Sequence, residues 1–279
     1  MTIGELIKTG AEMLRLAGKD DFDFDASCIA QFVLNLNYTS IRIKYLDKVE
    51  EANEIKYFSL IKERCADKPL QYILGEWEFM GLPFKVGEGV LIPRPETELL
   101  VEYAVNFLKN KENPIVFDLC SGSGCIAISV AKFCNNAKIY AFEKSEIAFD
   151  YLLKNIKLNG VRNIYALNED ICNQSIIPNV TPDLILSNPP YISSSEINNL
   201  QAEVKKEPVM ALDGGNDGLD FYRVISSLWI DRISSTGAVA VECGEDQTEQ
   251  IVELFSKKIK NVVPLNDLND LPRIVIAEK

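Results

Sequence analysis

The spacing of apolar residues divides the chain into three parts. In the first part they recur every three to four positions, around residues 6–16, 25–36 and 55–61. This period places them on one face of a helix. No residue types typical of a cofactor or catalytic site stand out among them. The pattern therefore predicts that residues 1–68 form a small N-terminal helical domain with an apolar core.

The second part, residues 69–92, is rich in aromatic residues placed around a turn. Trp77 and Phe79 precede the sequence Gly81-Leu82-Pro83, and Phe84 follows it. Apolar residues that alternate around a Gly/Pro turn are typical of a β-hairpin. We expect this hairpin to link the helical domain to the rest of the chain.

In the third part, residues 93–279, short apolar runs alternate with helical stretches. The expected strands lie at 115–117, 138–142, 163–167, 184–186, 238–241, 262–263 and 274–276, and the expected helices at 125–133, 145–158, 220–233 and 247–259. This alternation is typical of an α/β domain whose mainly parallel sheet has helices on both faces. In such sheets ligands bind beyond the carboxyl ends of the strands.

Composition narrows the possible functions. A hydrophobic fraction of 47% is normal for a globular protein, and no apolar run approaches the length of about 20 residues that crosses a membrane. The net charge of −12 argues against a broad nucleic-acid-binding face, which needs clustered Lys and Arg. Seven cysteines without a Cys-x-x-Cys pair, together with the lack of histidine, indicate reduced thiols in the cytoplasm and no metal site. The lack of histidine also excludes an imidazole base.

The sequence Asn188-Pro189-Pro190-Tyr191 follows the fourth expected strand. It suits the methylation of a planar neutral nitrogen, a poor nucleophile because its lone pair is delocalised, as in a peptide bond. The Asn188 side chain supplies one acceptor for the NH2 protons, and the Pro189 carbonyl can supply another. The prolines stiffen the backbone, and the Tyr191 ring can lie on the flat target group. The simpler alternative is a Pro-rich turn after a strand.

The sequence Asp118-Leu119-Cys120-Ser121-Gly122-Ser123-Gly124 follows the first expected strand and precedes a helix. Glycines at such a turn let a ligand approach the backbone next to a positive helix N-terminus. The spacing is not that of a dinucleotide-binding loop, and no phosphate-loop lysine follows. It fits a cofactor with an amino-acid tail, whose ammonium Asp118 would approach. Taken alone, an ordinary tight turn explains the motif equally well.

Acidic residues end the next two expected strands. Glu143 lies about 20 residues beyond the glycines, where an acid accepts hydrogen bonds from ribose hydroxyls. Asp170 could face an adenine amino group, and Ile171 could cover the adenine ring. A turn or cap role for Asp170 is the alternative. All these residues should meet at one edge of the sheet.

Further motifs extend beyond this edge. They are Pro69–Gly75, Leu91–Glu98, Glu207-Pro208 with Ala211-Leu212, and Asp217–Arg223. Together with Asn188–Tyr191, they make the chain resemble the PrmC/HemK family of peptide chain release factor glutamine methyltransferases, which use S-adenosylmethionine.

The resemblance implies a class I, Rossmann-like, seven-stranded methyltransferase sheet in residues 93–279. It also implies that residues 1–68 bind the substrate and that residues 69–92 form the linker. The substrate is then the glutamine in the Gly-Gly-Gln motif of class 1 release factors, which makes the protein part of translation termination. The methyl group goes to the side-chain amide nitrogen, and S-adenosylhomocysteine is the second product. We expect a monomer that binds neither nucleic acid nor membranes directly and needs no metal.

The resemblance also assigns roles to single residues. Those that would contact the cofactor are Asp118, Cys120, Ser121, Gly122, Ser123, Gly124, Glu143, Asp170, Ile171 and Asn188. Those that would hold the glutamine are Asn188, Pro189, Pro190 and Tyr191, with Arg94 and Glu96 closing over the site. The chain departs from the family at Cys120, where Gly is frequent, and at Glu143, where Asp is frequent. It also has Ile171 where some relatives have an aromatic residue.

Three other functions remain possible on the sequence. An adenine-N6 methyltransferase shares the Asn-Pro-Pro-Tyr turn and flips its target base out of the helix, but it should carry a basic groove. A non-catalytic module could bind a nucleoside or dock through its helical domain, but it would not need an amide clamp. Another protein with a Gly-Gly-Gln-like loop could be the methyl acceptor.

Overall fold

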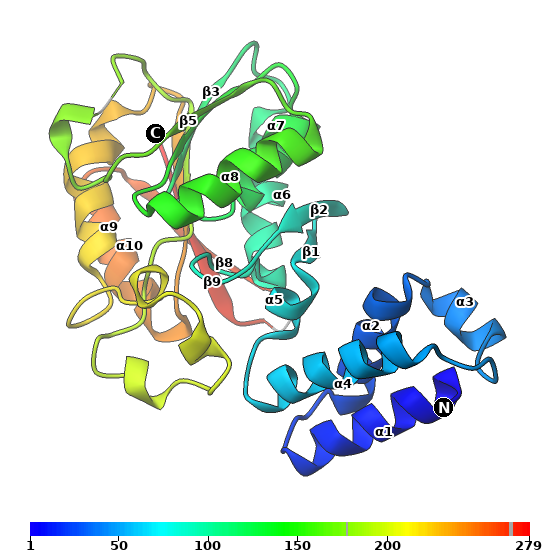
Figure 1. Cartoon of the computed structure of the whole chain (residues 1–279). Coiled ribbons are helices and arrows are strands. Elements are labelled where there is room, and N and C mark those ends of the chain that lie inside the picture. Colours follow the sequence, from blue (N-terminus) through cyan, green and yellow to red (C-terminus); the bar gives the residue numbers. More distant parts are fainter. Residues whose placement is uncertain (177, 268–269) are drawn as a thin grey trace. The chain divides into compact units, whose positions relative to one another are not determined.

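The computed structural model describes residues 1–176, 178–267 and 270–279. They form two compact units (Figure 1). One unit comprises residues 1–76 and 201–206, and the other comprises residues 77–200 and 207–279. Within these ranges, no helix is both long enough and apolar enough to cross a membrane.

The first unit is helical, as its sequence predicts. Its helices are α1 (Ile3–Leu16), α2 (Phe22–Leu34), α3 (Tyr38–Ile43), α4 (Glu51–Cys65) and α5 (Leu70–Leu74). Leu6, Ile29 and Ile61 are among its fully buried side chains. The Thr2 hydroxyl and the Glu5 carboxylate cap α1 reciprocally, which satisfies two backbone N–H groups at its start. The sequence did not predict α3 or α5.

A short segment from late in the chain also belongs to the first unit. The Glu203 carboxylate lies 2.7 Å from Arg64 Nη1 and 3.3 Å from Lys19 Nζ. Arg64 Nε also donates to Asp25 over 2.6 Å, and both of these side chains are buried. Buried charges require such partners, so this network fixes residues 201–206 to the helices.

The second unit is built on a seven-stranded sheet, which confirms the predicted α/β fold class. Its strands are β3 (Ile115–Leu119), β4 (Lys138–Phe142), β5 (Ile164–Leu167), β6 (Leu184–Ser187), β7 (Ala238–Glu242), β8 (Asn261–Asn266) and β9 (Pro272–Glu278). Their order is β5-β4-β3-β6-β7-β9-β8. The first five strands in this order are parallel, and β9 runs antiparallel to both of its neighbours.

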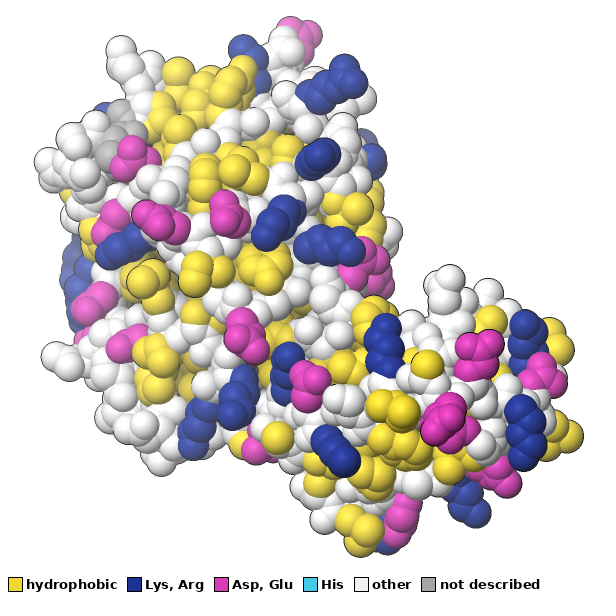
Figure 2. All heavy atoms as spheres, viewed as in Figure 1, with side chains coloured by type: hydrophobic (Ala, Val, Ile, Leu, Met, Phe, Trp, Pro, Cys, Tyr) yellow, Lys and Arg dark blue, Asp and Glu magenta, His cyan; other side chains and the backbone are white. Residues whose placement is uncertain are grey.

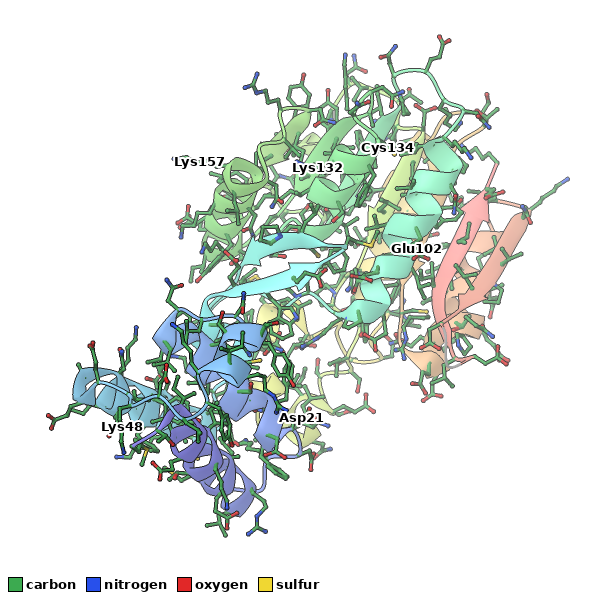
Figure 3. The ribbon with its side chains drawn as sticks, turned by 90° about the vertical axis from the view of Figure 1, so that its right-hand side faces the viewer. Asp21, Lys48, Glu102, Lys132, Cys134 and Lys157 are labelled. Carbon is green, nitrogen blue, oxygen red and sulfur yellow. The ribbon has the colours of Figure 1, made fainter. Side chains whose placement is uncertain are left out.

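Two apolar cores cover the two faces of this sheet. In β6, Leu184 and Leu186 belong to one core and Ile185 to the other. The first core includes residues of α6 (Glu98–Leu108), α7 (Cys125–Phe133) and α8 (Glu146–Asn159), and the second includes residues of α9 (Asp220–Val224) and α10 (Thr248–Ser256). Lys132 of α7 donates to the carbonyl of Asn159 at the end of α8 over 3.1 Å (Figure 3).

The predicted hairpin is present, with strands β1 (Glu76–Phe79) and β2 (Leu82–Lys85). It packs against α8, because Asn155 bonds both the N–H and the carbonyl of Lys85, at 2.6 and 3.0 Å. Asn159 Nδ2 also donates to the carbonyl of Pro83 over 2.9 Å. The hairpin is therefore held by side chains of the sheet-containing unit.

Two helical regions differ from the sequence-based expectation. The sequence did not predict α6, which follows a 3-10 turn at Pro95–Thr97. The expected helix at 220–233 consists of α9, a π-helical stretch at Ile225–Trp229 and a 3-10 turn at Ile230–Arg232. Other 3-10 turns occur at Gln174–Ile176, Ile197–Asn199, Val204–Lys206, Val209–Ala211 and Glu245–Gln247.

The helix-flanking glycines give a test of the packing between α7 and α8. Gly124 has φ of 83°, and a Cβ there would lie 2.4 Å from Leu152 Cδ1. Gly160 has φ of 65° and open space around it. Gly160→Ala should cost about 1–2 kcal/mol of unfolding free energy, from its left-handed backbone alone. Gly124→Ala should cost about 1–3 kcal/mol more, because it also overpacks the core.

The measurement is urea unfolding followed by tryptophan fluorescence. Both tryptophans, Trp77 and Trp229, belong to the sheet-containing unit, so the signal reports its unfolding. Equal destabilisation by the two substitutions would show that Gly124 is needed only for its backbone conformation.

Candidate active site

Four parallel strands end in one row at the carboxyl edge of the sheet. Leu119 of β3 pairs with Phe142 of β4 and with Ser187 of β6, and Ser187 pairs with Val241 of β7. The residues that come next in the chain therefore form the following row. They are Glu143, Cys120, Asn188 and Glu242, in their order across the sheet.

A pocket of about 350 Å³ opens over this edge. Of the residues predicted from the sequence, it is lined by Cys120, Gly122, Glu143, Asp170, Ile171, Asn188 and Pro190. Its volume lies in the range of about 300–1,000 Å³ that is typical of small-molecule sites. Residues predicted to contact ligands that do not line it are Asp118, Ser121, Ser123, Gly124, Pro189, Tyr191, Arg94 and Glu96.

The glycine turn presents bare backbone to this pocket. Cys120 and Gly122 both have positive φ, at 64° and 55°. No atom lies within 4 Å of the position that a Cβ on Gly122 would occupy. A bond of 2.8 Å from the Ser121 N–H to the carbonyl of Phe142 ties the turn to β4. Burial keeps the pKa of the Cys120 thiol well above its ordinary value, so this thiol stays neutral and weakly nucleophilic.

Asp118 lies beneath the turn, fully buried, and not in the pocket. Its Oδ2 accepts from the N–H of Ala127 in the first turn of α7, over 3.1 Å. Within the described part of the chain its Oδ1 has no hydrogen-bond partner. Burial raises the pKa of this carboxyl to about 7. Asp118 therefore holds the start of α7 and retains one unused acceptor beneath the turn.

Glu143 links the turn to the pocket. Its two carboxylate oxygens accept from the N–H groups of Gly122 and Ser145, each over 2.7 Å. The side chain is nine-tenths buried, and this burial raises its pKa despite those two bonds. Each oxygen still has a lone pair that could accept from a ligand hydroxyl.

Asp170 and Ile171 form another part of the pocket wall. The Asp170 carboxylate pairs with Lys144 over 2.8 Å and accepts from the N–H of Cys172 over 2.9 Å. Although partial burial opposes the shift, these bonds lower the pKa of Asp170. Ile171 is buried, and its carbonyl accepts from the Trp229 indole over 3.0 Å. Ile171 thus presents a fixed apolar surface beside an acidic residue that already has partners.

The Tyr191 ring is not part of the pocket lining. It is half-buried and packs against the core that contains Trp229. Its carbonyl accepts from Gln247 Nε2 over 2.7 Å. Burial raises the pKa of its phenol, so Tyr191 is neutral. Its backbone is fixed next to Pro190, which does line the pocket.

Arg94 is held by an ion pair with the buried carboxylate of Glu207. Glu207 also accepts from the N–H of Ile92 over 3.0 Å. These bonds attach the segment before α6 to Glu207. The next residue, Pro208, lines the pocket. Glu96 is exposed.

Sequence reasoning missed Thr97, which bonds to Asn188, and Glu242, which bonds to Thr97. The Asn188 Nδ2 group donates to Thr97 Oγ1 over 3.0 Å, and Thr97 Oγ1 donates to Glu242 Oε2 over 2.6 Å. Thr97 and Glu242 are both buried. Glu242 ends an expected strand, as Glu143 does, and this position was the signal that could have identified it. The pocket-lining segment Pro208–Ala211 and Phe221 were also missed as site residues.

The comparisons with known proteins identify relatives along the whole chain. Residues 5–75 match the model of the PrmC N-terminal domain, and residues 101–226 match that of the TRM5/TYW2 methyltransferase domain. A release factor glutamine methyltransferase from Clostridium botulinum is 36% identical, with all of both chains covered. One from Aquifex aeolicus is 32% identical over 94% of this chain and 92% of the relative.

Solved structures agree on the fold. A methyltransferase from Pyrococcus furiosus covers 72% of this chain and 90% of its own, with a TM-score of 0.53 at 22% identity. The human Mettl16 catalytic domain, solved with an RNA hairpin, covers 82% of both chains with a TM-score of 0.55 at 13% identity. At this level of identity they show the fold alone. The full-length relatives show more: the chain belongs to the family of release factor glutamine methyltransferases.

Proposed function

We propose that this protein transfers a methyl group from S-adenosylmethionine to the side-chain amide nitrogen of the glutamine in the Gly-Gly-Gln motif of class 1 release factors. The observation that carries the proposal is the hydrogen bonding of the Asn188 side-chain amide at the pocket. Its Nδ2 is bonded to Thr97, and within the described ranges no protein group donates to its Oδ1. An unused acceptor beside a cofactor-sized pocket suits the NH2 group of an amide.

Features of the pocket fit S-adenosylmethionine. The Gly122 backbone is open to the methionine part, Glu143 has lone pairs for the ribose hydroxyls, and Ile171 can pack on the adenine. Among the described residues no group of His, Cys, Asp or Glu is arranged to hold a metal ion. When bound, the cofactor supplies a methyl group on a positively charged sulfur.

The protein contributes mainly position and electrostatics to the reaction. The amide nitrogen would bond to the methyl carbon while the carbon–sulfur bond broke, and the electron pair of that bond would go to sulfur. Positive charge grows on the nitrogen, and Asn188 Oδ1 and the Pro189 carbonyl stabilise it by accepting from its protons. One proton then leaves to water, so no histidine is required. Positioning the amide nitrogen next to the methyl group supplies a further large part of the rate acceleration.

We assign substrate recognition to the N-terminal helices, residues 1–68, with residues 69–92 as linker and 93–279 as the catalytic domain. The match to the PrmC N-terminal domain supports this division. Free cysteines, three of them buried, fit a reducing cytoplasm. We expect the protein to act there as a monomer.

Methylation of adenine in a nucleic acid is less consistent with the surface. Figure 2 shows Lys and Arg side chains interspersed with Asp and Glu over the visible face, with no continuous basic band among the residues drawn in colour. A protein that binds phosphates over several nucleotides needs such a band. Family membership also favours the protein substrate.

The direct test mixes the protein, labelled S-adenosylmethionine and a class 1 release factor. Methyl transfer should depend on the glutamine of the Gly-Gly-Gln loop, so a release factor with Gln→Ala in that loop is the control. Label on the control factor, or on added RNA or DNA instead, would refute the proposed substrate.

Asn188→Ala should reduce the single-turnover methylation rate by about 10²–10³-fold, the typical cost of losing one stabilising group of the transition state. The Kd for S-adenosylmethionine should change little, because other residues supply most of the cofactor contacts. Rapid-quench kinetics and calorimetry measure the two quantities. Equal losses in rate and affinity would contradict the assigned role.

Glu143→Gln should weaken cofactor binding. It removes a charged acceptor, and a hydrogen bond to a charged group contributes about 1.5–3 kcal/mol, so the Kd should rise about 10- to 100-fold. Glu102→Gln in α6 is the matched control, since Glu102 is exposed on a helix away from the pocket lining (Figure 3). Calorimetric titration with S-adenosylhomocysteine measures both. An unchanged Kd in Glu143→Gln would show that the ribose is held elsewhere.

A further inference from the structure

We propose that Thr97 and Glu242 are positioning residues that fix the orientation of the Asn188 amide, so that its oxygen faces the substrate. The proposal deepens the proposed function and rests on it, because it concerns the same acceptor. It adds two residues that the cofactor and glutamine contacts expected from the sequence do not include.

The direction of the hydrogen bonds follows from the number of protons. An ionised carboxylate can only accept, and a threonine hydroxyl has a single proton to donate. The distance of 2.6 Å between Thr97 Oγ1 and Glu242 Oε2 is typical of a hydroxyl bonded to a charged carboxylate. While Glu242 is ionised, the Thr97 proton is therefore committed to it, and only a lone pair of Oγ1 remains for Asn188.

That lone pair selects one of the two orientations of the amide. With Nδ2 toward Thr97, the contact of 3.0 Å is a hydrogen bond. With the amide reversed, two acceptor oxygens would face each other at this distance, with no proton between them. The chain of donors thus ends on the carboxylate and leaves Asn188 Oδ1 as the acceptor for the substrate. Successive hydrogen bonds of this kind also polarise one another, which strengthens the terminal acceptor.

The surroundings keep the pair in place. Thr97 and Glu242 are each about 1% exposed, so water does not compete for their bonds. The Tyr222 hydroxyl donates to the backbone carbonyl of Glu242 over 2.7 Å, which fixes the end of β7. Thr97 ends the 3-10 turn before α6, yet its hydroxyl does not cap that helix. Its side chain is used at the site and not for local helix stability.

The charge state of Glu242 supplies a second readout. Burial raises its pKa to about 7, although bonds from Thr97 and Asn188 and the charge of Arg273 oppose the shift, and Glu96 adds to it. Tyr191, which also faces this carboxylate, is neutral. A protonated Glu242 can donate to Thr97, which frees the Thr97 proton and allows the reversed amide. The methylation rate should therefore fall as the pH drops through the pKa of Glu242.

The test is a double-mutant cycle with single-turnover methylation of the release factor as the readout. Thr97→Val keeps the shape of the side chain and removes its hydroxyl. It should slow methylation about 10- to 100-fold. This is the loss typical of metal sites when a residue that orients a metal ligand is removed, and Thr97 orients Asn188 in a comparable way. The Kd for S-adenosylhomocysteine and the KM for the release factor should stay within about twofold. Thr97→Ser should restore most of the rate.

In the Asn188→Ala background, Thr97→Val should have no further effect, because the residue that it orients is absent. Glu242→Gln should lower the rate and remove its decline at acid pH, since Gln does not ionise. Thr248→Val is the matched control: it also removes the hydroxyl of a buried threonine, which faces Cys243 and not the pocket. Its methylation rate should remain that of the parent protein.

Two results would overturn the inference. One is a normal rate in Thr97→Val, and the other is a full additional loss from Thr97→Val in the Asn188→Ala background. Failure of the proposed function would look different, because the parent protein would then not methylate the release factor, or Asn188→Ala would have no effect.

Discussion

The pairing register of β6 with its two neighbours is the constraint on which the site depends. A shift by one residue would move Asn188 about 3.3 Å along the sheet and exchange the faces of every β6 side chain. Side chains fix the register at both ends of the strand. Asp183 accepts from the N–H of Ile115 over 3.0 Å, and the Ser187 hydroxyl donates to the carbonyl of Leu119 over 2.7 Å. Between them, alternate apolar residues of β6 face different cores.

This register also explains why so many polar groups can be buried at one edge. Asp118, Glu143 and Glu242 would each destabilise an apolar interior, because a buried carboxylate must find donors. The turn after β3, the first turn of α7 and the 3-10 turn before α6 provide them, in the N–H groups of Gly122 and Ala127 and the hydroxyl of Thr97. The pKa values of these three carboxyls are raised, because the hydrogen bonds from the donors only partly offset the unfavourable free energy of burying a charge. Such costs are typical of functional sites.

The sequence predicted the parts of the structure that have a local signal. The alternation of short apolar runs with helical stretches gave the α/β sheet, and the turn motifs identified Gly122, Glu143 and Asn188 as pocket residues. It could not identify the pair of Thr97 and Glu242, which are 145 residues apart and meet only through the order and register of the strands. Helix α6 was also missed, although its buried residues Leu100, Val101, Ala104 and Leu108 recur at helical spacing. The ring of Tyr191 packs against the core and is not among the residues that line the pocket, and its contact with the substrate stays a prediction.

The three residues expected to depart from the family pattern, Cys120, Glu143 and Ile171, all line the pocket. Glu143 accepts from Gly122 as well as Ser145, so the residue proposed to bind the ribose also holds the turn proposed to bind the methionine part. Ile171 cannot stack as a ring does, but the bond from Trp229 to its carbonyl fixes its backbone against the pocket. The thiol of Cys120 stays protonated and does not compete for the methyl group. Glu143 and Ile171 are thus fixed by bonds within the protein itself. A pocket that is rigid before the cofactor binds loses less conformational entropy on binding, which offsets weaker individual contacts.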